Sequence, residues 1–449
     1  MLSLKDLLLT PLYLALFYGL AIAVRSKVTN VYTKRYYLPA LTVKFIGAIA
    51  LGLVYEFYYG GGDTTNYYRH ASLINQAFGD SFSAGLHLFF STDYNPTTAK
   101  YVAQMFWFSG MAEYTVVQLA AVIGLFCFNT YTVIALGFAL LSFSGMWVLF
   151  ITLAKLRPQE YHWLAIAVFF LPSVFFWGSG LMKDSLCIGA LGWLFYAFYR
   201  GAIQRQRVPT MLVVGGLAAY LLFNIKVYIL LSFLPPALLW VFNENSQQIK
   251  NATLRMLLKP VFFVVGGAVA VFAGATLTEG DEKYDIDNIG ERSKITADYL
   301  YGVSVATEGS AYTLGEQDGT IGGMVKLAPQ AIVVSLFRPF LWEVRNPVML
   351  LSSLESLFML LFTLRILIRS GVGRTLALIV RTPVLTLCFV FALVFAATVG
   401  IVSNNFGTLV RYKIPLIPFY MAGLIITQSL STTKTPARAK TRQQALVRG

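Results

Sequence analysis

Long apolar runs separated by short polar segments extend along almost the whole chain. Several runs approach or exceed the roughly 20 residues that an α-helix needs to cross a bilayer. This pattern predicts an all-α, polytopic integral membrane protein with roughly 11–13 transmembrane helices. The runs that could cross are residues 7–24, 41–57, 115–128, 131–154, 165–177, 186–199, 211–223, 227–242, 261–277, 330–342, 347–368, 384–402 and 414–430.

Composition agrees with this pattern. The chain is 57% hydrophobic and 12% charged, with a mean hydropathy of +0.65, whereas soluble domains carry about 25% charged residues. The net charge of +14 comes largely from basic residues in short loops and in the tail, which is the distribution expected on the cytoplasmic side of a membrane protein. We therefore expect membrane lipid, and no nucleic acid, as the partner of these charges.

Residues 1–430 are expected to form one transmembrane domain, with two longer polar segments between the runs. Residues 58–114 are expected to be an outer loop with interfacial helices, and the acid-rich residues 278–328 a long outer loop without clear secondary structure. Residues 431–449 are expected to be a basic cytoplasmic tail. The first run is read as a span and not as a cleaved signal peptide.

The side of the membrane on which Asp63 lies depends on the span count. Counting back from the tail puts the loop that contains Lys34 outside, against its charge. We give more weight to the four basic residues of that loop and expect Asp63 to lie outside. This requires either that residues 115–154 cross an odd number of times or that part of residues 81–111 crosses or re-enters.

The main candidate for chemistry is the turn Gly60-Gly61-Gly62-Asp63, which directly follows the second run. Ionisable groups at the membrane cost about 2.5–3.5 kcal/mol on insertion scales, so each needs a reason. Similar small-residue turns precede Lys183-Asp184 and Arg411. Charged groups at several outer span ends suggest that they surround one site.

Cations at headgroup level suit a lipid diphosphate, and a carboxylate could activate an attacking sugar hydroxyl. Asp63 is the first candidate for this catalytic carboxylate, followed by Asp184 and Glu343. No metal or other cofactor is expected, although Asp285-Ile286-Asp287 has a spacing that a divalent cation could use. The candidate substrate-binding residues are Arg69, His70, Lys183, Lys226, Arg338, Arg411 and Lys413.

Structural roles compete with this interpretation. Lys183 and Asp184 could be a simple ion pair within one turn. Arg338 and Glu343 could be an interfacial pair that fixes a re-entrant helix. The two C-terminal cations at 411 and 413 could be snorkelling anchors. Glu355, inside an apolar run, could pair with a neighbouring serine or arginine.

Three short segments resemble the EpsG-like and Wzy-type bacterial polysaccharide polymerases. Gly61-Gly62-Asp63-Thr64-Thr65-Asn66-Tyr67 resembles their early Gly-x-Asp-Thr-x-x-Tyr stretch. The turn from Gly180 to Leu186 is similar to their basic turn, with Lys183 where arginine is usual. Leu409-Val410-Arg411-Tyr412 resembles their C-terminal Arg-Tyr stretch.

The resemblance implies an envelope glycan polymerase or glycosyltransferase. It would use a polyprenyl-diphosphate-linked oligosaccharide at the outer face of the bacterial inner membrane, and could work with polysaccharide export or assembly proteins. The wider GT-C membrane glycosyltransferases also place an aspartate in their first outer loop. Two other functions stay open. The first is a transporter or lipid-linked glycan flippase, which Glu355, Lys226 and Pro235-Pro236 support. The second is a non-enzymatic envelope assembly scaffold that uses residues 278–328.

Overall fold

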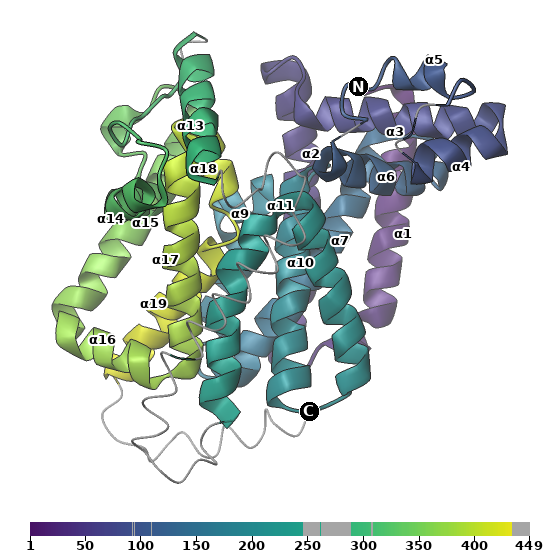
Figure 1. Ribbon diagram of the computed structural model, residues 1–449. Coiled ribbons are helices and arrows are strands. Elements are labelled where there is room, and N and C mark those ends of the chain that lie inside the picture. The colour runs from purple at the N-terminus through teal and green to yellow at the C-terminus, as the bar shows by residue number, and fades with distance from the viewer. Residues whose placement is uncertain are drawn as a thin grey trace. The chain divides into compact units, whose positions relative to one another are not determined.

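The computed structural model describes residues 1–91, 93, 95–108, 110–245, 261, 289–306 and 309–432 (Figure 1). Within these ranges the chain is helical and has no strand, apart from an isolated bridge between Ala311 and Asn405. Seven of the described helices are long and apolar enough to cross a membrane, or eight if a bent pair counts as one span. The chain is therefore a polytopic α-helical membrane protein. It divides into two compact units, each of which is considered by itself.

Unit 1 comprises residues 1–148, 174–193 and 217–226. Its first two spans are long because their sequences are apolar on all sides. The helices in this part of the chain are α1 (Leu4–Val28), α2 (Lys34–Leu53) with its continuation η1 (Val54–Tyr58), α3 (Asp63–Asp80), α4 (Phe82–Phe90), α5 (Ala99–Val102), α6 (Met111–Leu125), the first part of α7 (Tyr131–Leu156), α9 (Pro172–Trp177), the first part of α10 (Lys183–Ala197) and part of α11 (Val208–Asn245).

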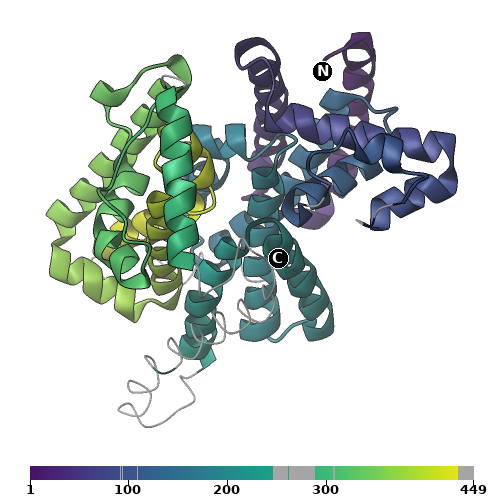
Figure 2. The same ribbon diagram turned by 45° about the horizontal axis from the view of Figure 1, so that its top comes forward.

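Helix α3 is amphipathic and differs from the spans. It buries Tyr67, His70, Ala71 and Ile74, which recur at helical spacing on one face. In Figure 1, α3 runs across the view while α1 runs down it, and Figure 2 brings the same end of unit 1 forward. The expected interfacial helices of residues 58–114 thus have a counterpart in α3, α4 and α5.

Helix α6 has 15 residues and is not among the seven described helices that are long and apolar enough to cross a membrane. Its Ala121 carbonyl accepts a hydrogen bond from Asn75 Nδ2 of α3 (3.1 Å), and its Gln118 Nε2 donates to the Phe89 carbonyl of α4 (2.6 Å). Asn75 also bonds Asn129, just before α7 begins (2.5 Å). The middle of α6 therefore packs beside α3 and α4, and the expected span at residues 115–128 stays a prediction.

Helix α7 is the described helix in residues 115–154 that is long and apolar enough to cross a membrane. It begins beside Thr64, and its Trp147 Nε1 donates to the carbonyl of Val28, at the far end of α1 (3.0 Å). The basic loop that follows α1 therefore lies at the end of unit 1 opposite Asp63, as its charge predicts for a cytoplasmic loop.

Helix α11 reverses direction at Lys226, where the backbone leaves the helical region (φ −150°, ψ 76°). A straight helix of this length would extend about 57 Å, yet Asn245 at its end bonds Arg205 Nη2 (3.2 Å) and the Ala202 carbonyl (3.4 Å), which precede its start. The prediction of two separate runs, 211–223 and 227–242, is confirmed.

Unit 2 comprises residues 149–173, 194–216 and 227–449. Its core helix is α17 (Pro383–Ser403), whose residues are mostly buried against α13, α14 and α19. The other described helices here are α8 (Tyr161–Ala165), η2 (Ile166–Phe170), η3 (Phe198–Ile203), α13 (Ile289–Ala306), α14 (Ile321–Phe337), η6 (Leu341–Glu343), α15 (Pro347–Ser370), α16 (Val372–Arg381), α18 (Phe406–Tyr412) and α19 (Ile417–Thr432).

Two further expectations need correction. Residues 278–328 are not a loop without secondary structure, because α13 and the start of α14 fall within them; residues 278–288 lie outside the described part. The expected span at 165–177 is interrupted at Leu171, which is extended (ψ 131°). Leu171 directly precedes Pro172, and a proline disfavours the helical conformation in the residue before it. The run 262–277 and the tail 433–449 also lie outside the described residues.

Candidate functional site

The Asp63 turn is built by three consecutive glycines with positive φ: Gly60 at 69°, Gly61 at 134° and Gly62 at 136°. A Cβ on Gly62 would lie 2.7 Å from the Tyr55 ring, so a side chain is excluded there for space as well as for backbone conformation. Asp63 is the first residue of α3 and is half-buried.

Side chains of α3 fix this turn to the start of α7. The hydroxyl groups of Thr64 and Tyr131 are 2.8 Å apart, and Tyr68 donates to the Asn129 carbonyl (2.9 Å). Tyr67 packs on Trp107 with ring centroids 4.8 Å apart. The aspartate is therefore held on a rigid element and not on a loose loop.

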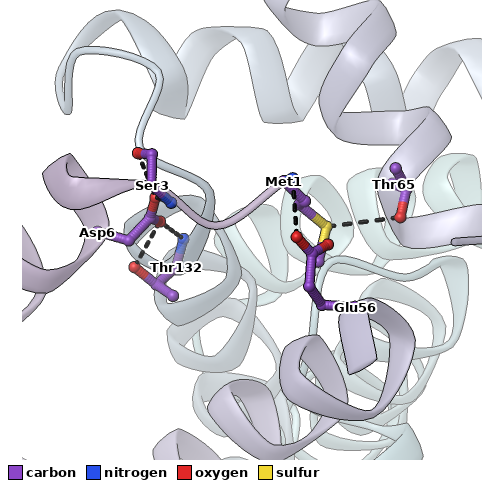
Figure 3. A network of polar contacts seen from close by, with 6 residues as sticks. All are labelled: Met1, Ser3, Asp6, Glu56, Thr65 and Thr132. Carbon is purple, nitrogen blue, oxygen red and sulfur yellow. Dashed lines mark hydrogen bonds and ion pairs between the residues drawn. The ribbon is translucent and has the colours of Figure 1, made fainter. Parts of the chain in front are cut away.

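A second network fixes the start of α1 at the same end of unit 1 (Figure 3). The Asp6 carboxylate accepts hydrogen bonds from the N–H (2.8 Å) and the hydroxyl (2.9 Å) of Thr132, and from the Ser3 N–H (2.9 Å). The amino group of Met1 pairs with Glu56 at 3.1 Å. Helices α1, η1, α3 and α7 thus meet at this end.

The two neighbours Lys183 and Asp184 do not form the simple turn pair that the sequence allowed. Lys183 pairs with Glu113 at the start of α6, and Asp184 pairs with Lys226 at the break in α11 (2.5 Å). The Lys226 and Asp184 side chains are 7% and 1% exposed. These two ion pairs join α6, α10 and α11, and Glu113 is a participant that sequence reasoning missed.

Arg69 and His70 differ in surroundings although they are adjacent on α3. Arg69 is exposed, whereas His70 is fully buried with its ring against the edges of Phe106 and Trp107. Neither ring nitrogen has a hydrogen-bond partner. Burial, together with the neighbouring Arg69 charge, lowers the pKa of His70 to about 4. His70 is thus neutral and packed inside the interfacial helices, which weakens its candidacy as a substrate contact.

In unit 2, Arg338 and Glu343 form the ion pair expected as their structural alternative. Arg338 Nε lies 3.1 Å from both carboxylate oxygens, and the Phe340 N–H also donates to Glu343 (2.7 Å). Burial would raise the pKa of Glu343, but the Arg338 and Phe340 hydrogen bonds outweigh it and lower the pKa. The guanidinium also lies over the Phe406 ring, 4.9 Å from its centroid.

The two C-terminal cations behave differently. Lys413 is 1% exposed and donates to the Arg338 carbonyl (3.2 Å) and to Ser356 Oγ (3.0 Å), so it is not a snorkelling anchor. Arg411, on α18, is half-buried. Glu355 accepts hydrogen bonds from the Ser173 N–H (2.9 Å) and hydroxyl, which agrees with the serine partner expected for it.

Sequence reasoning also missed Lys44, which lies inside α2 and is completely buried. Its Nζ donates to the Gly178 carbonyl (2.7 Å), to Ser142 Oγ (3.1 Å) and to the Val174 carbonyl (3.4 Å). The signal was available, because Lys44 and Glu56 are the only charged residues in the apolar run 41–57.

The structure divides the predicted site residues between the units. Asp63, Arg69, His70, Lys183, Asp184 and Lys226 belong to unit 1, and Arg338, Glu343, Arg411 and Lys413 to unit 2. Asp285 and Asp287 lie outside the described residues. Among the described residues, no three or more His, Cys, Asp or Glu side chains gather as a metal site would require.

None of the protein-family models, curated proteins or solved structures compared with the chain matches it.

Proposed function

We propose that the chain is a membrane glycosyltransferase or polymerase that extends an envelope glycan. Its donor would be a polyprenyl-diphosphate-linked saccharide at the outer face of a bacterial inner membrane. The observation that carries the proposal is Asp63, a half-buried carboxylate in a rigid glycine turn, at the end of unit 1 opposite the basic loop. The resemblance of the surrounding residues to EpsG-like and Wzy-type polymerases supports it.

In this proposal Asp63 is the general base. It accepts the proton of the acceptor sugar hydroxyl as that oxygen attacks the anomeric carbon, and the lipid diphosphate leaves. Asp184 is bound to Lys226 and Glu343 to Arg338, and we assign these two carboxylates to positioning. Asp63 is also the first residue of α3, which holds it at a fixed position.

The candidate phosphate-binding cations also differ in their contacts. Lys183, Lys226 and Arg338 each share their charge with a carboxylate, so a diphosphate would have to compete with Glu113, Asp184 or Glu343. We therefore assign these three mainly to positioning. Arg69 in unit 1 and Arg411 in unit 2 stay proposed phosphate contacts, each within its own unit.

The test is Asp63→Asn in cells that depend on the protein for glycan synthesis. Loss of a general base predicts about a hundredfold or greater decrease in transfer rate, seen as missing long chains at normal protein level. Asp80→Asn, at the exposed end of the same helix, is the matched control and should leave chain length unchanged. Normal chain length in the Asp63 variant would contradict the proposal.

A second candidate, a transporter or lipid-linked glycan flippase, is favoured by the buried Lys44 and by the 67° bend between α18 and α19. Broken spans and intramembrane charges are typical of transporters. Lipid translocation by purified protein in proteoliposomes, without any glycan transfer, would favour it. For either candidate function, we also propose that the chain crosses the membrane roughly 11–13 times.

A further inference from the structure

Helix α1 leaves a cavity of about 270 Å³ between itself and helices α2, α7 and α10, all within unit 1. Of the 25 residues of α1, only Asp6 and Ala21 are buried. Its contacts with α2 include the hydrogen bond between the Tyr18 and Thr42 hydroxyl groups (2.7 Å) and the packing of the Tyr18 ring on Phe45. The cavity is lined by one face of α1 (Phe17, Leu20, Ala21, Val24 and Val28) and by residues that include Leu41, Phe143, Ser144, Trp147 and Trp193.

The lining is suited to an apolar ligand. Two lining residues carry a hydroxyl group, Tyr37 and Ser144; Ser144 accepts a hydrogen bond from Trp193 Nε1 (3.0 Å) and donates to the Leu141 carbonyl (2.7 Å). The indole N–H of Trp147 is bonded to the Val28 carbonyl. Because Ser144 and the two indole N–H groups already have partners, the cavity favours hydrocarbon over water or a polar ligand.

Positive charge gathers at one end of the cavity. Arg25 and Lys27 belong to the last turn of α1, beside the lining residue Val28, and Lys34 and Arg35 begin α2. Arg25 Nη2 donates to the Lys34 carbonyl (2.9 Å), which joins these two groups. Residues 7–55 contain no acidic residue. Clusters of Lys and Arg next to a span attract anionic lipid headgroups.

The cavity has the depth of one leaflet. From Phe17 to Val28 the lining extends about 16 Å along α1, and one leaflet of hydrocarbon is about 15 Å deep. A chain that enters beside the cations would fill it without reaching the Asp63 end. We propose that the cavity holds an acyl chain of an anionic phospholipid whose phosphate lies against Arg25 and Lys27.

The test uses the quenching of tryptophan fluorescence by phospholipids with brominated acyl chains, because Trp147 and Trp193 line the cavity. The full-length protein is placed in nanodiscs with brominated phosphatidylglycerol or, at equal mole fraction, brominated phosphatidylcholine. Quenching should reach half its maximum at about a fivefold lower mole fraction of the anionic lipid. Equal quenching curves for the two lipids would overturn the proposal.

Variants separate the headgroup from the chain. Arg25→Gln with Lys27→Gln should abolish the preference, whereas the matched control Arg369→Gln with Arg374→Gln, two exposed basic residues of unit 2, should retain it. Ala21→Phe should fill the cavity and reduce quenching by both lipids. If that variant does not fold, Trp193→Phe should remove part of the lipid-dependent quenching. Loss of preference in the control, or unchanged quenching in a folded cavity variant, would refute the assignment.

Discussion

Asp184→Asn should destabilise the protein strongly, because it leaves the ammonium of Lys226 buried without its carboxylate. The two groups are 2.5 Å apart and their side chains are 1% and 7% exposed. Removing one partner of a buried ion pair typically costs about 3–5 kcal/mol. The loss can be measured as the free energy of unfolding in a detergent titration or as a shift of the thermal unfolding midpoint in nanodiscs.

Two comparisons make this prediction specific. Asp80→Asn breaks an ion pair with Lys100 whose side chains are 58% and 64% exposed, so it should change stability far less. Asp184→Asn combined with Lys226→Met removes both charges and should recover most of the loss. If Asp184→Asn is as mild as the Asp80 variant, or the double variant is as unstable as the single one, the pair does not hold α10 to α11 as described.

Three further predictions follow from the described contacts. Gly62→Ala should cost about 1–3 kcal/mol of stability, and more than Gly60→Ala, because a Cβ would meet the Tyr55 ring at Gly62 but open space at Gly60. The thermal unfolding midpoints of the two variants check this, and equal values would contradict it. Arg338→Lys should lower the thermal midpoint because lysine cannot bond both carboxylate oxygens of Glu343, and the difference from wild type should shrink as the pH falls through the lowered pKa of Glu343; a difference independent of pH would argue against the pair. As the pH is lowered from 6.5 to about 4, stability should fall because His70 takes up a proton in the unfolded protein but not in the folded one. His70→Phe should lose this dependence of the unfolding free energy on pH, and an unchanged dependence would assign it to other groups.

The sequence predicts the spans better than it predicts their surroundings. Long apolar runs such as the one that became α17 are recognised because burial in lipid or core requires them. Helix α6 was expected to be a span, but it is shorter than the candidate spans and packs beside α3 and α4; apolar content alone does not distinguish such a helix from one that crosses. Helix α13 was missed because its sequence has weak periodicity, and its packing against α17 is a tertiary contact.

The candidate site shows a similar division. The Asp63 turn could be located because three glycines before an acid are a local signal. The partners of Lys183 and Asp184 could not, since Glu113 and Lys226 are distant in sequence and meet them only through the fold. The expectation that Lys183 and Asp184 would pair because they are neighbours in the sequence therefore failed.

The loose attachment of α1 has a consequence for assembly of the chain. Helix α1 forms its backbone hydrogen bonds within itself, apart from the N–H that Pro11 lacks, and has an apolar surface, so it is stable in lipid before it docks. Its side-chain ties include hydrogen bonds from Asp6 to Thr132 near its start and from Tyr18 to Thr42 at its middle. Docking of α1 is then a late and separately reversible step, and its amides near Thr132 should exchange hydrogen sooner than those of α17.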